Sequence, residues 1–169
     1  MLDLKQMIVD AFRDVRYPGD DNLLNDVSSR SPNWKYVGDS DVWQLLHGKM
    51  WQDMPVREFL FCDTPVPDLR PAAFQFYMPA LLLASLDESL DVSVDIALTL
   101  AFYLAPSSAV NDTGPSFTRY NDKGGFKKRI ATFSNRQKEV MILVFKEHVR
   151  RGNLNEDDVA AAIQYLEAA

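Results

Sequence analysis

The chain has 169 residues, of which 47% are hydrophobic and 25% charged, and its formal net charge is −6. A chain of this length can bury about 70% of its unfolded surface in one domain, and its apolar content excludes a disordered protein. Residues 1–6 lack the apolar segment of a secretory signal, and the longest apolar run, Ala80 to Leu86, is too short to span a membrane. We therefore expect one soluble cytoplasmic domain, residues 1–169, that makes no contact with a membrane.

Apolar residues recur with helical spacing near the N-terminus. They lie one turn apart from Leu4 to Val15, and charged residues occupy the other positions. Asp3 is placed to cap this helix, and Tyr17-Pro18-Gly19 should end it, because the residue before a proline avoids helical dihedral angles. From Asp20 to Pro67 the glycines and prolines leave only short pieces, of which we expect one, from about Ser40 to His47, to be helical.

Large aromatic residues gather in this irregular part of the chain: Trp34, Tyr36, Trp43 and Trp51. Packing beneath loops is the simpler interpretation, since such side chains are mostly buried. A recognition surface is the alternative. The single cysteine, Cys62, follows an apolar stretch and is expected to be a buried, reduced thiol.

The middle of the chain supplies the expected core. Pro71 suits a first helical turn, and the helix that it starts should kink or break at Pro79, which lacks a backbone donor. The segments from Ala80 to Leu86 and from Val94 to Leu104 are apolar on every side, which is typical of helices in the centre of a bundle. We expect these two helices to pack against each other.

Two further helices are predicted at the C-terminus. Ser134 and Gln137 form a capping box before the apolar run from Val140 to Phe145, and a basic last turn precedes Gly152. Asn155 should cap the last helix, whose first turn is acidic. An antiparallel hairpin of these two helices completes the predicted fold, which is all-α: a single-domain helical bundle of about six helices with long irregular loops.

Positive charge is concentrated in one part of the chain. Residues 119–151 contain ten basic and three acidic residues, whereas the rest of the chain is acidic. Residues 105–133 show no sustained periodicity, so we expect a long loop with a short hairpin around residues 123–125. The basic segment 119–138 could attract nucleic-acid phosphates or an acidic protein, or it could face the acidic remainder of the same molecule.

The sequence contains no recognised catalytic motif. It has no Gly-x-Ser-x-Gly turn, no His-Glu-x-x-His spacing and no phosphate-binding loop. His47 and His148 are the only histidines, and His148 is explained by a place near a helix C-terminus, where positive charge is favoured. Two groups of carboxylates could hold a divalent cation or could serve as caps and turns: Asp20-Asp21 and Asp39-x-Asp41. We expect no resident metal and no cofactor.

Four separated segments resemble a bacterial family known only as a domain of unknown function. They are Tyr17-Pro18-Gly19-Asp20-Asp21-Asn22, Gly48-Lys49-x-Trp51, Phe76-Tyr77-Met78-Pro79-Ala80-Leu81-Leu82 within the run from Ala73 to Leu86, and Phe133-Ser134-x-x-Gln137. The ordered set covers most of the chain. The resemblance implies a small bacterial cytosolic protein and brings with it no activity or ligand.

These observations favour a non-enzymatic protein-binding module, specifically an immunity-type protein that neutralises a toxin. The small acidic fold, the missing catalytic motifs and the separate basic segment motivate this hypothesis. Two contact surfaces are candidates: Tyr17, Asp20, Asp21 and Trp51 on one side, and Lys127, Lys128 and Arg129 on the other. The alternatives are a small metal-dependent enzyme using Asp20, Asp21, Asp39 or Asp41, and nucleic-acid binding through residues 119–138.

Overall fold

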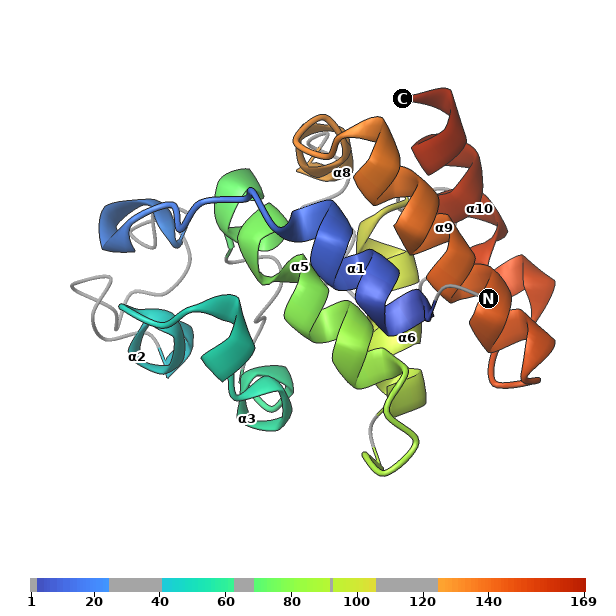
Figure 1. The fold of residues 1–169 in the computed structure, drawn as a ribbon, viewed down its shortest axis with the longest axis horizontal. Coiled ribbons are helices and arrows are strands. Elements are labelled where there is room, and N and C mark those ends of the chain that lie inside the picture. The colour runs from blue at the N-terminus through green and yellow to red at the C-terminus, as the bar shows by residue number, and fades with distance from the viewer. Residues whose placement is uncertain (1–2, 25–40, 63–68, 92, 106–124) are drawn as a thin grey trace, which may run out of the picture.

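The structure, a computed structural model, describes residues 3–24, 41–62, 69–91, 93–105 and 125–169 (Figure 1). Within these ranges the chain is helical and forms no strands, and an isolated antiparallel bridge joins Leu24 to Leu69. The predicted all-α fold is confirmed. Eight α-helices lie in the described ranges, more than the six expected, because several helices are very short.

The elements follow one another as α1 (Leu4–Phe12), the 3-10 helix η1 (Asp20–Asn22), α2 (Asp41–Leu46), the 3-10 helix η4 (Trp51–Asp53), α3 (Val56–Leu60), α5 (Pro71–Ser85), α6 (Ser93–Tyr103), α8 (Gly125–Ile130), α9 (Asn135–Arg150) and α10 (Glu156–Ala168). None of the helices within the described ranges is long and apolar enough to cross a membrane.

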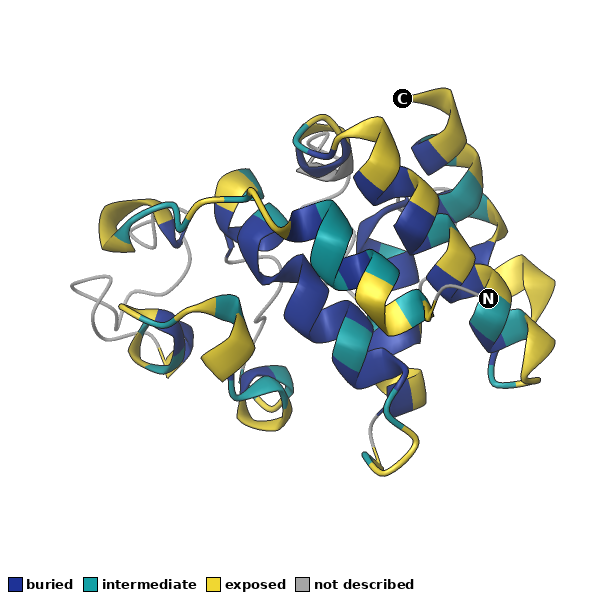
Figure 2. Cartoon of the chain, viewed as in Figure 1, coloured by how far each residue is buried: buried dark blue, intermediate teal, exposed yellow. Residues whose placement is uncertain are grey.

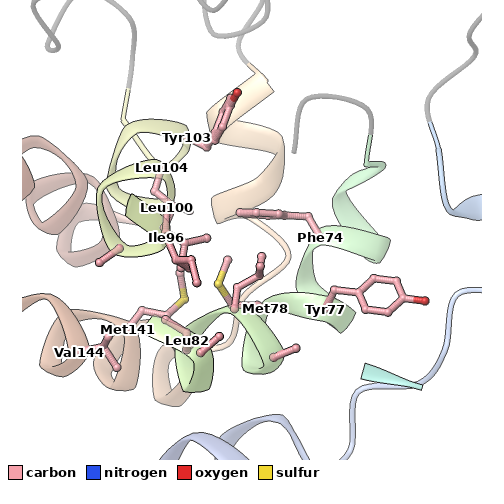
Figure 3. Close-up of a cluster of buried hydrophobic side chains, with 14 of the residues drawn as sticks. Phe74, Tyr77, Met78, Leu82, Ile96, Leu100, Tyr103, Leu104, Met141 and Val144 are labelled. Atoms are coloured by element: carbon pink, nitrogen blue, oxygen red, sulfur yellow. The ribbon is translucent and has the colours of Figure 1, made fainter. Parts of the chain in front are cut away.

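Helix α5 is the centre of the fold. Eleven of its fifteen residues are buried, and it lies in the middle of the bundle in Figure 2. Helices α1 and α6 both pack against it. Figure 3 shows side chains of α5, α6 and α9 meeting in one cluster that includes Met78, Ile96 and Met141. The predicted packing of the two apolar helices is confirmed.

Of the kink or break predicted at Pro79, the break is wrong, because α5 continues through this residue. A proline inside a helix costs about 3 kcal/mol. The neighbours Phe76, Tyr77 and Met78 are fully buried, and burial of each such side chain contributes about 1.5–3 kcal/mol. Packing around the helix therefore offsets the lost hydrogen bond.

The C-terminal hairpin forms as predicted. The Ser134 hydroxyl accepts a hydrogen bond from the Gln137 backbone N–H at 3.3 Å, and the Gln137 side chain accepts one from the Ser134 N–H at 3.0 Å. At the start of α10 the Asp158 carboxylate accepts from the Asn155 N–H at 2.9 Å. Helix α9 packs against both α10 and α1, and α9 and α10 run in opposite directions in Figure 1.

Part of the predicted long loop is helical instead. Helix α8 begins at Gly125, and residues 123–124 of the predicted hairpin lie outside the described residues. The helix ends at Ile130, which is buried together with Phe133. Burial of these side chains against the bundle stabilises a helix of six residues, too short to show a periodic pattern in the sequence.

The short N-terminal elements form a lobe beside the bundle. We define the lobe as η1, α2, η4 and α3 with their connecting residues 17–24 and 41–62, seen to the left of α5 in Figure 1. Arg70 joins the lobe to α5: its backbone N–H donates to Leu23 O at 2.9 Å, and its Nε donates to Leu24 O at 2.7 Å.

His148 lies at the contact of α9 with the end of α5 and is fully buried. Its Nε2 is 3.2 Å from the Ser85 hydroxyl, which itself donates to Leu82 O at 2.8 Å. Burial, and then the nearby Arg151 charge, lower the pKa of His148 below its ordinary value. The positive charge that we expected at this helix end is therefore disfavoured, because desolvation outweighs the helix dipole.

This burial predicts an acid-sensitive fold. The pKa of His148 is lower in the folded state than in the unfolded chain. Its contribution to the free energy of unfolding is therefore fully present above about pH 6.5 and is lost below that pH, where the unfolded chain binds a proton that the folded protein does not. We expect the free energy of unfolding to fall between pH 7.5 and pH 5.5 in the wild type, and to fall less in His148→Gln. Urea denaturation at several pH values measures this.

The exposed His47 supplies the matched control, because His47→Gln makes the same substitution at the surface and the comparison isolates the effect of burial. The carboxylates of Asp20, Asp87 and Glu147 have lowered pKa values, so their contributions disappear only in more acidic solution. Parallel pH profiles for the wild type and His148→Gln would contradict the assignment.

Candidate functional site

The turn before η1 is hydrogen-bonded to the loop after α2. The Tyr17 hydroxyl donates to the Asp20 carboxylate. The Gly48 backbone N–H lies 2.8 Å from Asp20 Oδ1 and 2.9 Å from the Tyr17 hydroxyl oxygen, so both oxygens accept from it. Two of the predicted binding residues are thus brought together around one backbone group.

A second tyrosine holds the same loop from the side of the core. The Tyr77 hydroxyl lies 2.8 Å from Leu46 O and 2.9 Å from Lys49 O, and donates to this pair of carbonyls. Figure 3 shows its ring pointing away from the other side chains of the cluster. We call Tyr17, Asp20 and Tyr77, with the loop 46–49 that they hold, the clasp.

The charges of the clasp are fixed by burial and by its hydrogen bonds. The bonds from Tyr17 and then from the Gly48 N–H lower the pKa of Asp20. Burial, and then the bond to Asp20, raise the pKa of Tyr17 to about 12. Burial, followed by the neighbouring Tyr17 and Asp20, also raises the pKa of Tyr77. At neutral pH the clasp therefore consists of one carboxylate and two protonated tyrosines.

Side chains beside the clasp are displayed at the surface. The His47 ring is exposed and stacks on Trp43, with ring centroids 4.2 Å apart and planes within 2°. Met50 follows the clasped loop and is 47% exposed. Trp51 is half-buried and packs against the core, while Asp21 is exposed. Of the four residues predicted for this side, Tyr17 and Asp20 are structural parts of the clasp and Asp21 and Trp51 flank it.

The Asn22 side chain of the same turn has local partners as well. The Asn22 side chain donates to Pro18 O at 3.0 Å and accepts from Arg70 Nη1 at 3.1 Å. Gly19 has a φ of 84°, in the left-handed region that favours glycine. The segment from Tyr17 to Asn22 therefore reads as a turn whose polar groups bond to one another and to neighbouring loops.

The predicted basic surface is smaller than expected. Lys127 and Lys128 on α8 are exposed, but Arg129 is fully buried. The Arg129 guanidinium lies over the rings of Phe74 and Tyr103, 5.1 Å and 5.3 Å from their centroids, and Nη1 donates to Tyr103 O at 3.2 Å. Arg129 therefore packs within the core and is not part of an exposed contact surface. Residues 119–124 lie outside the described residues.

The carboxylates proposed for a cation do not converge in the part of the chain that the structure describes. Asp39 lies outside it, Asp20 accepts the bonds of the clasp, and Asp41 is exposed in the first turn of α2. Across the described ranges there is no group of three or more His, Cys, Asp or Glu residues that could hold a metal ion.

Comparison with known proteins places the chain in a family without assigning it an activity. The model of a family of unknown function, DUF6714, matches residues 1–168. The chain belongs to this family. No curated protein and no solved structure matches it. The expected membership in a family of unknown function is confirmed, and the clasp is a geometric feature of a DUF6714 member for which no function is established.

The sequence contained only part of the signal for this site. Tyr17, Asp20, Gly48 and Tyr77 all stand in the segments of the family resemblance, yet Tyr77 was grouped with the core helix rather than with the loop. Met50 and the stack of His47 on Trp43 were not singled out. Nothing in the sequence around Met50 indicates that its side chain is exposed.

Removing the Tyr77 hydroxyl tests the clasp. Tyr77→Phe removes the side-chain donor to Leu46 O and Lys49 O, while Leu46 O still accepts from the Lys49 N–H at 3.1 Å. Loss of one hydrogen bond of this kind costs about 0.5–1.5 kcal/mol. We expect this loss in urea denaturation, and a smaller one for Tyr17→Phe, because the more exposed Asp20 and Gly48 can bind water. An equal or larger effect of Tyr17→Phe would contradict the ordering.

Gly48 tests the backbone of the same loop. Its φ is 67°, and an added Cβ would meet no atom within 4 Å. Gly48→Ala should therefore destabilise the protein by about 1–2 kcal/mol through backbone conformation alone. Gly48→Asn should cost less, since asparagine tolerates the left-handed region better. Equal stability of Gly48→Ala and the wild type in thermal unfolding would show that the loop relaxes.

Proposed function

We propose that this chain is a non-enzymatic protein-binding module that recognises a basic partner through the exposed surface of the lobe. An immunity-type role, in which the partner is a toxin, is the specific form of this proposal. The clasp is the observation that carries it. The loop 46–49 is bonded from one side by Tyr17 and Asp20 and from the other by Tyr77, so a partner would meet a surface whose ordering has already occurred during folding.

The lobe that contains this ordered loop also displays apolar side chains at its surface. Met50 is 47% exposed, and Phe61 is 73% exposed, the highest value among the large hydrophobic residues that the structure describes as exposed. Trp43 and Trp51 belong to the same lobe and are half-buried. Methionine and aromatic residues are enriched in the centres of protein interfaces, where most of the binding energy resides. These residues supply the apolar centre of the proposed contact.

Charge determines the kind of partner. The described residues of the lobe include five acidic and two basic side chains. Asp20 is held in its charged form by the clasp, and Asp21 is exposed beside it. An acidic surface accelerates encounter with a basic partner and disfavours an acidic one. We therefore expect the partner to carry Lys and Arg side chains around an apolar patch.

Affinity capture from the native host tests this proposal with a matched pair of variants. The lobe variant replaces Met50 and Phe61 by serine. The control variant replaces Leu98 and Leu143 by serine as well, and these two residues are 44% and 41% exposed on the bundle. We expect the wild type and the control to capture the same basic protein. The purified partner should bind the lobe variant at least about tenfold more weakly, a difference of about 1.4 kcal/mol.

Circular dichroism of both variants shows that each is folded before binding is compared. Two results would overturn the proposal: no specific partner with the wild-type bait, or a partner that the lobe variant retains and the control loses. A captured protein with net negative charge would contradict the part of the proposal that concerns charge.

A further inference from the structure

A concave surface lies between the start of α1, α3 and the end of α5. It is a cleft of about 440 Å³, and none of the clasp residues lines it. Its lining includes the apolar side chains of Met54, Leu83 and Leu90. Small-molecule sites typically measure about 300–1,000 Å³ and combine an apolar lining with a few polar groups. The cleft is open to solvent, and its volume and its apolar side chains suffice for a small ligand.

Two opposite charges also line this cleft, Lys5 on α1 and Asp87 just after α5. The Ser89 hydroxyl and backbone N–H both donate to Asp87 Oδ1, at 2.7 Å and 3.0 Å. These bonds, and then the nearby Lys5 charge, lower the pKa of Asp87. Asp87 is therefore a carboxylate at neutral pH, and its second oxygen takes no part in the bonds to Ser89.

With its other charged residues included, the lining of the cleft has no net charge. Arg57 pairs with Asp91 at 3.0 Å, and Glu58 follows it on α3. The lining thus contains two basic and two acidic side chains. A ligand with a single charge would be attracted by one of Lys5 and Asp87 and repelled by the other. A ligand that carries both charges close together can pair with both residues.

From this juxtaposition we infer that the cleft binds a free α-amino acid with an apolar side chain. Its carboxylate accepts from Lys5 Nζ, its ammonium group donates to Asp87 Oδ2, and its side chain packs on Met54, Leu83 and Leu90. The inference goes beyond the proposed function and rests on different residues, so either can fail without the other.

Ligand-dependent thermal unfolding of the full chain tests this inference directly. The probes are L-leucine, L-methionine and L-phenylalanine at up to about 20 mM, since a ligand that binds only the folded state raises the midpoint by mass action. Glycine at equal concentration controls for general stabilisation by a cosolute. N-acetyl-L-leucine lacks the ammonium charge and L-leucinamide lacks the carboxylate, so each should bind at least tenfold more weakly than L-leucine.

Substitutions then test the two charged groups. We expect Lys5→Met and Asp87→Asn each to weaken binding of the best probe at least tenfold, measured by calorimetric titration. Asp95→Asn, at an exposed position on α6, should leave binding unchanged. If Asp87→Asn is destabilised through its turn, Lys5→Met still decides the question. The inference is overturned if no amino acid raises the midpoint more than glycine, if the capped ligands bind equally, or if both variants bind as the wild type does.

Discussion

Burial of most of α5 is the constraint on which the rest of the structure depends. A helix in this position can leave few polar side-chain atoms without partners, because an unsatisfied buried group costs more than a hydrogen bond contributes. Three polar side chains of α5 find partners in three different elements: Gln75 donates to Thr132 O at 2.5 Å, Tyr77 to the loop after α2 at 2.8 Å, and Ser85 lies 3.2 Å from His148. These contacts determine where the neighbouring elements dock, since apolar packing alone would accept several positions.

The parts of this arrangement that the sequence predicted are the parts that depend on local pattern. The capping box at Ser134, the amphipathic face of α1 and the apolar segments of α5 and α6 each appear within one or two helical turns of sequence. They were predicted correctly for that reason. The failures share a physical origin as well: the continuity of α5 through Pro79 and the helical state of α8 both come from tertiary burial, which overrides a local preference.

The site was less predictable because its contacts are long-range. Gly48 lies 28 residues from Asp20 and 31 from Tyr17, and Tyr77 lies 31 from Leu46. A tyrosine in a core helix has no local sign that its hydroxyl leaves the core. The same holds for Arg129, which stood in a run of basic residues typical of a solvated surface but is covered by Phe74 and Tyr103. A run of basic residues does not show which of them are exposed, because exposure depends on which face of the helix the bundle covers.

The clasp changes how the family resemblance should be interpreted. Tyr17, Asp20, Gly48 and Tyr77 stand in the segments that carry the resemblance, and each has a partner within the chain that accounts for it. These bonds explain the four residues as parts of the scaffold, although Asp20 uses only Oδ1 in them and keeps its charge at the surface. A search for activity that starts from these motif residues would therefore start from residues that hold the loop 46–49 in place. The side chains that the proposed contact would use, such as Met50 and Asp21, lie instead at the surface beside the clasp.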